Sequence, residues 1–87
     1  MDRSEIGRQL RALRQQTGLR LVDVARRAGM ATSTLHYLEH GQISLLPWAC
    51  RLGEVLDRNR VMNLAAAALA DQYPSEILER VRQAVPA

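Results

Sequence analysis

Apolar residues recur at helical spacing along the whole chain. At the start, Ile6, Leu10 and Leu13 share one face, and Asp2 and Glu5 have the spacing of a capping box. Similar stripes predict helices over residues 3–16, 21–28, 32–40, 47–56, 60–72 and 76–85. No stretch shows the strict alternation of a β-strand. The pattern therefore predicts an all-α fold of five or six helices.

Single residues mark the ends of several of these segments. Gly18, Gly29 and Gly41 follow the first three, where a residue in the left-handed conformation commonly ends a helix. Pro47 opens the fourth, and residues 57–59 are interpreted as a connector to the fifth. The fourth helix is expected to bury Leu52, Val55 and Leu56, with Trp48 and Cys50 partly inside.

Composition narrows the class of protein. Aromatic residues make up 3% of the 87 residues and Phe is absent, so the core must be built from Leu, Val, Ile and Ala. The single cysteine, Cys50, excludes an internal disulfide and a cysteine-cluster zinc site. The N-terminus lacks the apolar region of a signal peptide, and the apolar run at 64–70 is too short to span a bilayer. We therefore expect a cytoplasmic protein.

Charge is distributed unevenly along the chain. All twelve basic residues are arginine, and the formal net charge is +3. Residues 1–60 hold ten arginines and six acidic residues, whereas residues 61–87 hold two arginines and three acidic residues. This asymmetry favours a phosphate-facing domain, 1–58, followed by a near-neutral helical segment, 59–87, with another task.

The segments 21–28 and 32–40 have the pattern of a helix-turn-helix, two short helices joined by a turn that contains glycine. Ala25 is small where the helices must cross, and Gly29 suits a positive φ angle in the turn. If Leu35 and Leu38 hold the second helix against the domain, four polar residues face outward: Thr32, Ser33, His36 and Tyr37. Such a helix can enter the major groove of DNA and read base edges. The competing interpretation is an ordinary amphipathic surface helix, but the outward face is almost uncharged, which favours contact with bases.

A series of ordered spacings extends this pattern: Leu10-Arg11-Ala12-Leu13-Arg14, Gly18-Leu19, Val24-Ala25, Ala28-Gly29, and Leu35 with Leu38-Glu39-His40-Gly41. On these residues the sequence resembles the lambda-repressor/Cro-like (XRE) family of helix-turn-helix regulators over about residues 6–56. The resemblance implies a lambda-repressor-like DNA-binding domain. It also implies an interior ion pair between Arg14 and Glu39, which would otherwise be two solvated surface charges.

The resemblance further assigns contacts with DNA. The residues that it implies for base reading are Thr32, Ser33, His36 and Tyr37. The residues that it implies for phosphate contact are Arg20, Thr34, His40 and Gln42. The chain departs from the family at Leu21, where a polar residue is usual. It also departs at Arg20 and Ala31, which replace the customary Ser or Thr helix caps.

These features together predict a transcriptional regulator that needs no cofactor, a repressor that binds a palindromic operator as a homodimer. The C-terminal helices are expected to form the dimer contact through Leu64, Ala65, Ala68, Leu69, Ile77, Leu78, Val81 and Val85. The same stripe could instead pack within one chain. A second hypothesis is an antitoxin of the same fold, in which residues 60–87 hold a toxin and the protein regulates its own promoter.

The segment from His36 to His40 also spells H-x-x-E-H, a zinc peptidase motif. A catalytic zinc needs a third protein ligand and a substrate cleft, yet the chain has only these two histidines, and Glu39 is assigned to Arg14. No Ser-His-Asp set, P-loop or dinucleotide-binding glycine motif is present. We therefore expect neither an enzyme nor a metal site.

Overall fold

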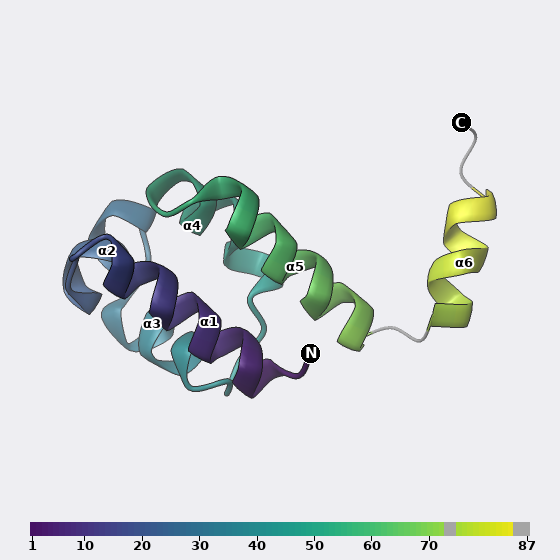
Figure 1. The fold of residues 1–87 in the computed structure, drawn as a ribbon, viewed down its shortest axis with the longest axis horizontal. Helices are drawn as coiled ribbons and strands as arrows, with labels where there is room; N and C mark the ends of the chain where they lie inside the picture. The colour runs from purple at the N-terminus through teal and green to yellow at the C-terminus, as the bar shows by residue number, and fades with distance from the viewer. Residues whose placement is uncertain (73–74, 85–87) are drawn as a thin grey trace.

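The computed structural model describes residues 1–72 and 75–84 (Figure 1). The helices are α1 (Arg3–Gln16), α2 (Leu21–Ala28), α3 (Thr32–Glu39), α4 (Ala49–Val55), α5 (Arg58–Gln72) and α6 (Ser75–Ala84), and a 3-10 turn, η1 (Leu46–Trp48), precedes α4. Within these described ranges there is no strand. The prediction of an all-α fold is confirmed.

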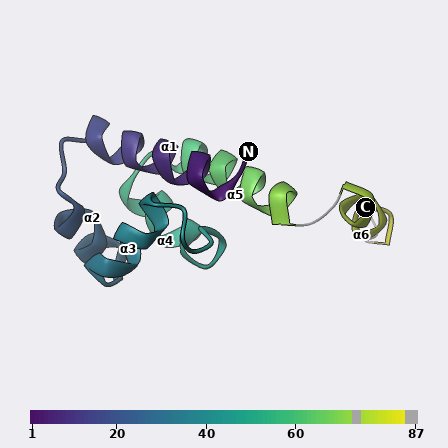
Figure 2. The same cartoon turned by 90° about the horizontal axis from the view of Figure 1, so that it is seen from below.

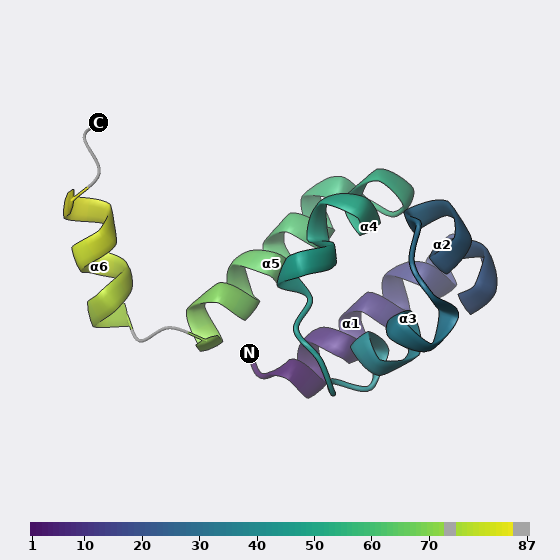
Figure 3. The ribbon, with the colours of Figure 1, turned by 180° about the vertical axis from the view of Figure 1, so that it is seen from behind.

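The first five helices form two layers. Figure 2 shows α1 and α5 side by side on one level and α2, α3 and α4 on the other. In Figure 1, α1 and α5 run in opposite directions, so the N-terminus lies near the end of α5. Figure 3 looks onto the layer that carries α2, α3 and α4. In these views α6 stands apart from both layers, beyond the end of α5.

One core joins the five helices. The largest fully buried side chains are Leu10, Val24, Leu35, Leu52 and Val61, and each comes from a different helix of α1 to α5. The boundary expected between residues 58 and 59 falls in the first turn of α5. Since α5 contributes to this core, the core does not divide there.

Two local expectations about α4 and α5 were wrong. Residues 58 and 59 belong to α5 and not to a connector, because Asp57 caps the helix: the Arg60 N–H donates to its Oδ1 over 3.1 Å. Cys50 is exposed, since it lies on the side of α4 that faces away from the core. Among the described residues, no helix is long and apolar enough to cross a membrane.

Candidate nucleic-acid interface

The turn between α2 and α3 is fixed by backbone geometry. Gly29 has φ +68°, the left-handed conformation expected of it. Its N–H donates to the Arg26 carbonyl over 3.2 Å, and the Met30 N–H donates to the Ala25 carbonyl over 3.0 Å. This is a Schellman motif, and Met30 and Ala25, which stand at the two positions of its usual apolar contact, are both buried in the core. The turn therefore sets the direction in which α3 leaves α2.

The end of α3 is held against the start of α1. Gly41 has φ +72°, and the N–H groups of Gly41 and Gln42 donate to the carbonyls of Leu38 and Tyr37 over 3.1 and 2.9 Å. A Cβ at Gly41 would lie only 2.7 Å from Cα of Ser4. Any larger residue here would push α3 away from α1.

Sequence reasoning missed the close approach of Gly7 to the backbone of α3. It is a buried residue of α1, and a Cβ there would lie 2.6 Å from the carbonyl oxygens of both Leu38 and Glu39. The available signal was its position three residues before Leu10, on the apolar face of the helix. Glycine at this position allows the backbone of α3 to lie directly on α1.

An ion pair joins the same two helices. Arg14 Nε and Nη2 donate to the two carboxylate oxygens of Glu39 over 2.7 and 2.9 Å, and Nη1 donates to the Leu19 carbonyl over 3.2 Å. The side chains are 14% and 3% exposed. Hydrogen bonding to Glu39 raises the pKa of Arg14, against the opposing effect of burial. This is the pair that the family resemblance implied, and it links α1, α3 and the loop before α2.

The outer face of α3 is polar and carries no carboxylate. Leu35 and Leu38 are 0% and 2% exposed, so the opposite side of the helix points to solvent. The residues on that side are Thr32, Ser33, His36 and Tyr37, all of them exposed. The one acidic residue of α3 is Glu39, which Arg14 neutralises inside the protein. A negatively charged polymer therefore meets no repelling side chain on this helix.

The candidate phosphate contacts differ in their accessibility. Arg20, His40 and Gln42 are exposed, while Thr34 is half-buried. Arg20 is already paired, because its Nε and Nη2 donate to the two carboxylate oxygens of Asp23 over 3.0 and 3.2 Å. These bonds from Arg20 hold the pKa of Asp23 below its usual range. Asp23 also accepts from the Arg20 N–H over 3.2 Å, which is the bond that the third helical residue makes in a capping box, while the Arg20 side chain itself gives α2 no cap.

A further arginine reaches the turn from α4. Arg51 Nη1 donates to the Gly29 carbonyl over 3.2 Å, and its guanidinium carbon lies 5.3 Å from the ring centroid of Trp48. This cation–π contact and hydrogen bond place a positive charge beside the turn between α2 and α3. Sequence spacing could not reveal it, since Arg51 is 22 residues from its partner.

His36 of α3 and His40, the residue that follows its last turn, lie together on the surface. The ring centroids of His36 and His40 are 4.1 Å apart, and His40 Nδ1 is 2.8 Å from the His36 carbonyl oxygen. Both oxygens of Glu39 are bound by Arg14, so Glu39 is not available to act as the carboxylate of an H-x-x-E-H zinc peptidase. In the part of the chain that the structure describes, no group of three or more potential metal-ligating side chains occurs.

The expected dimer contact on α5 needs correction. Leu64 and Ala68 are 4% and 7% exposed and belong to the chain's own core, so they cannot meet a second copy. Ala65 packs against this core, whereas Leu69 and Ile77 are 41% and 47% exposed. The side chains of Leu78 and Val81, and all of Val85, lie outside the described residues. The apolar stripe of α5 thus serves mainly to pack on α1 and α4.

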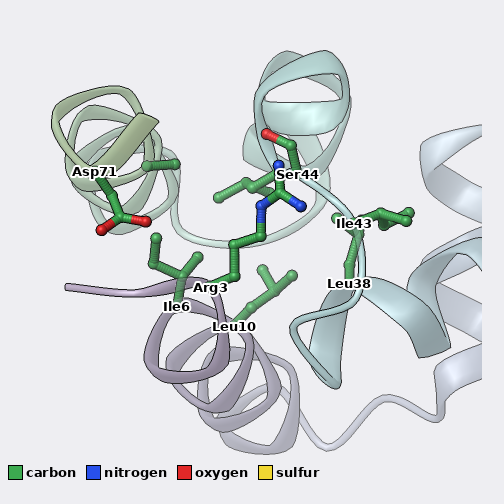
Figure 4. A pocket seen from close by; sticks show the side chains of 9 residues that line it. Arg3, Ile6, Leu10, Leu38, Ile43, Ser44 and Asp71 are labelled. Atoms are coloured by element: carbon green, nitrogen blue, oxygen red, sulfur yellow. The ribbon is translucent and has the colours of Figure 1, made fainter. Parts of the chain in front are cut away.

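A hollow of about 220 Å³ lies away from the outer face of α3, between α1, α5 and the loop that follows α3 (Figure 4). Its apolar lining includes Ile6, Leu10 and Leu38, and Arg3 and Asp71 also line it. In Figure 4 the Arg3 side chain extends across this space toward Ser44. The hollow therefore contains a basic group but is separate from the candidate DNA-reading residues.

Comparison with known proteins agrees with this geometry. A family model described as a helix-turn-helix domain matches residues 5–71. No curated protein and no solved structure gives a significant match. The matched range includes α2, α3 and the turn between them, and it extends nearly to the end of α5, which shares their core.

Proposed function

The chain belongs to the helix-turn-helix domain family, and from this we propose that it is a sequence-specific transcriptional repressor that binds a palindromic operator as a homodimer. The observation that carries the proposal is the geometry of α3. Its apolar side is locked by Leu35 and Leu38, its acid is neutralised inside, and its polar side is open to solvent. A helix presented in this way fits the major groove.

Within this proposal the residues divide into two roles. Thr32, Ser33, His36 and Tyr37 read base edges with hydroxyl, imidazole and phenol groups. Arg20, Thr34, His40 and Gln42 contact the phosphates and set the register of the helix. Arg20 precedes α2 and is held by Asp23 in the free protein, so it must exchange that partner for a phosphate, and Arg51 adds charge beside the turn. Repression follows if the bound protein excludes polymerase from an overlapping promoter.

The dimer would place two copies of α3 in successive major grooves, about 34 Å apart. Because Leu64 and Ala68 are buried in the core, the contact in the C-terminal segment falls to residues that remain accessible. Among the described residues of that segment, Leu69 at the end of α5 and Ile77 on α6 are exposed large apolar side chains. Static light scattering on the full chain should give the mass of a dimer, and Leu69→Glu combined with Ile77→Glu should give that of a monomer. The same mass for both proteins would exclude this contact.

The antitoxin hypothesis is a second candidate, because the exposed Ile77 is equally accessible to a different protein. In this hypothesis the C-terminal segment holds the second protein, and the helix-turn-helix binds the promoter of the antitoxin's own gene. A stable complex of fixed stoichiometry with the product of a neighbouring gene would favour the antitoxin. A symmetric dimer alone favours the simple repressor.

Base reading is tested with an operator selected from random duplex DNA. Thr32→Ala or Tyr37→Ala should each cost about 1–3 kcal/mol of binding free energy on that site and relax sequence preference at one position. Asn63→Ala is the matched control, because Asn63 is exposed on α5, in the other layer. If a Thr32→Ala/Tyr37→Ala double variant prefers the selected site as strongly as the parent does, α3 is not the reading helix.

A further inference from the structure

Two imidazole rings, one in the last turn of α3 and one on its C-cap residue, are close enough to share one ligand. His36 and His40 are four residues apart, both are exposed, and their ring planes are inclined by 32° at a centroid distance of 4.1 Å. Side chains four residues apart in a helix lie one above the other on the same face. These are the only histidines of the chain.

A contact with the backbone favours one tautomer of the His40 ring. A carbonyl oxygen can only accept a hydrogen bond, so the 2.8 Å contact between His40 Nδ1 and the His36 carbonyl requires the proton on Nδ1. The neutral ring then keeps its lone pair on Nε2. Metal-binding histidines are oriented in this way, with one ring nitrogen donating to a carbonyl and the other free for the metal.

We propose that His36 and His40 form a two-nitrogen chelating site for a late first-row divalent cation, of the class Zn²⁺, Ni²⁺ and Cu²⁺. Imidazole nitrogen suits these metals, and water would complete the coordination sphere. Glu39 takes no part, since Arg14 binds both of its oxygens. The site is therefore a surface chelate without a catalytic carboxylate, unlike the peptidase motif that the letters spell.

The consequence for DNA rests on the proposed function. His36 and His40 lie on the face proposed to meet DNA, and Tyr37 packs edge-on against His36 at 5.7 Å. A hydrated cation on the pair would occupy the space of a base edge and hold both rings away from it. The cation should thus weaken DNA binding. It should also stabilise the fold, because only the native helix brings the two nitrogens together.

The site is tested by Zn²⁺ titration of the full chain in a Cys50→Ser background, because the exposed thiol of Cys50 binds the same metals. Calorimetry should give one Zn²⁺ per chain, and the proton resonances of both imidazoles should shift together. His36→Gln and His40→Gln should each weaken Zn²⁺ binding by about 100-fold, since each removes the effective concentration that the second ring supplies. Equal affinity in the parent and either single variant would overturn the site.

Two further measurements test the metal site separately from its effect on DNA binding. Zn²⁺ should raise the Tm of the Cys50→Ser parent but not of the two histidine variants, and this readout needs no DNA. Zn²⁺ should also release the parent from its selected duplex, and a chelator should restore binding. If the metal-free protein fails to bind any duplex, the proposed function is wrong, and the Tm shift still decides the site. If it binds and Zn²⁺ leaves its affinity unchanged, the inhibitory role is wrong.

Discussion

Replacing Arg14 by methionine should destabilise the protein far more than removing an arginine usually does. In the native protein Glu39 is 3% exposed and both of its carboxylate oxygens accept from Arg14. Arg14→Met leaves that buried carboxylate without a partner, which costs about 3–5 kcal/mol of the free energy of unfolding. A chain of 87 residues has about 4–13 kcal/mol in total, so the loss is a large fraction of it.

The assay is urea unfolding followed by far-ultraviolet circular dichroism. Arg8→Met is the matched control, because Arg8 pairs with Glu5 on the exposed side of the same helix, with side chains 70% and 40% exposed. It should leave the midpoint nearly unchanged. Arg14→Met should lower the urea midpoint, and in a thermal melt it should lower the Tm by at least about 12 °C, because each kcal/mol corresponds to about 4 °C or more in a domain of this size.

A double variant identifies the physical cause. Arg14→Met with Glu39→Leu removes both charges and fills the space with apolar atoms, so it should recover much of the lost stability. Two results would refute the reasoning. One is an Arg14→Met variant as stable as Arg8→Met. The other is a double variant no more stable than the single one, which would mean that the loss comes from packing and not from an unpaired charge.

Three further predictions concern α1 and the start of α2. Gly7→Ala should lower the free energy of unfolding by about 1–3 kcal/mol, because its Cβ would meet the backbone carbonyls of Leu38 and Glu39 at 2.6 Å. Gly53→Ala should be tolerated in the same urea assay, since the nearest atom to its Cβ is the end of the flexible Met62 side chain at 3.2 Å. Arg20→Gln should raise the pKa of Asp23 toward its ordinary value, as measured by carboxyl NMR titration. In the native protein, the stability from this pair is present above the ordinary aspartate pKa and is lost as pH falls through the lowered value. Asp23→Asn should strengthen binding to random duplex DNA by freeing Arg20; unchanged or weaker binding would argue against a phosphate contact there.

The helices themselves could be predicted because local signals are strong in this chain. Apolar stripes and glycine stops gave the bounds of α1 and α2 as the structure has them, and Gly18 and Gly29 have the positive φ angles expected of residues that end helices. The start of α5 was placed too late because the capping signal of Asp57 was overlooked. That error was avoidable, since Asp is a favoured helix cap.

The spacing of apolar residues along a helix does not show what its apolar face packs against. The stripe of α5 has the same pattern whether it meets a second copy or the chain's own α1 and α4, and only the tertiary structure placed Leu64 and Ala68 in the core. The close approach at Gly7 and the reach of Arg51 to the turn depend on residues more than twenty positions away. The sequence by itself therefore determined the helices, their turns and the polar face of α3, because these follow from neighbours a few residues apart. The tertiary structure decided which faces are shared and which remain open, because that depends on how five helices compete for one core.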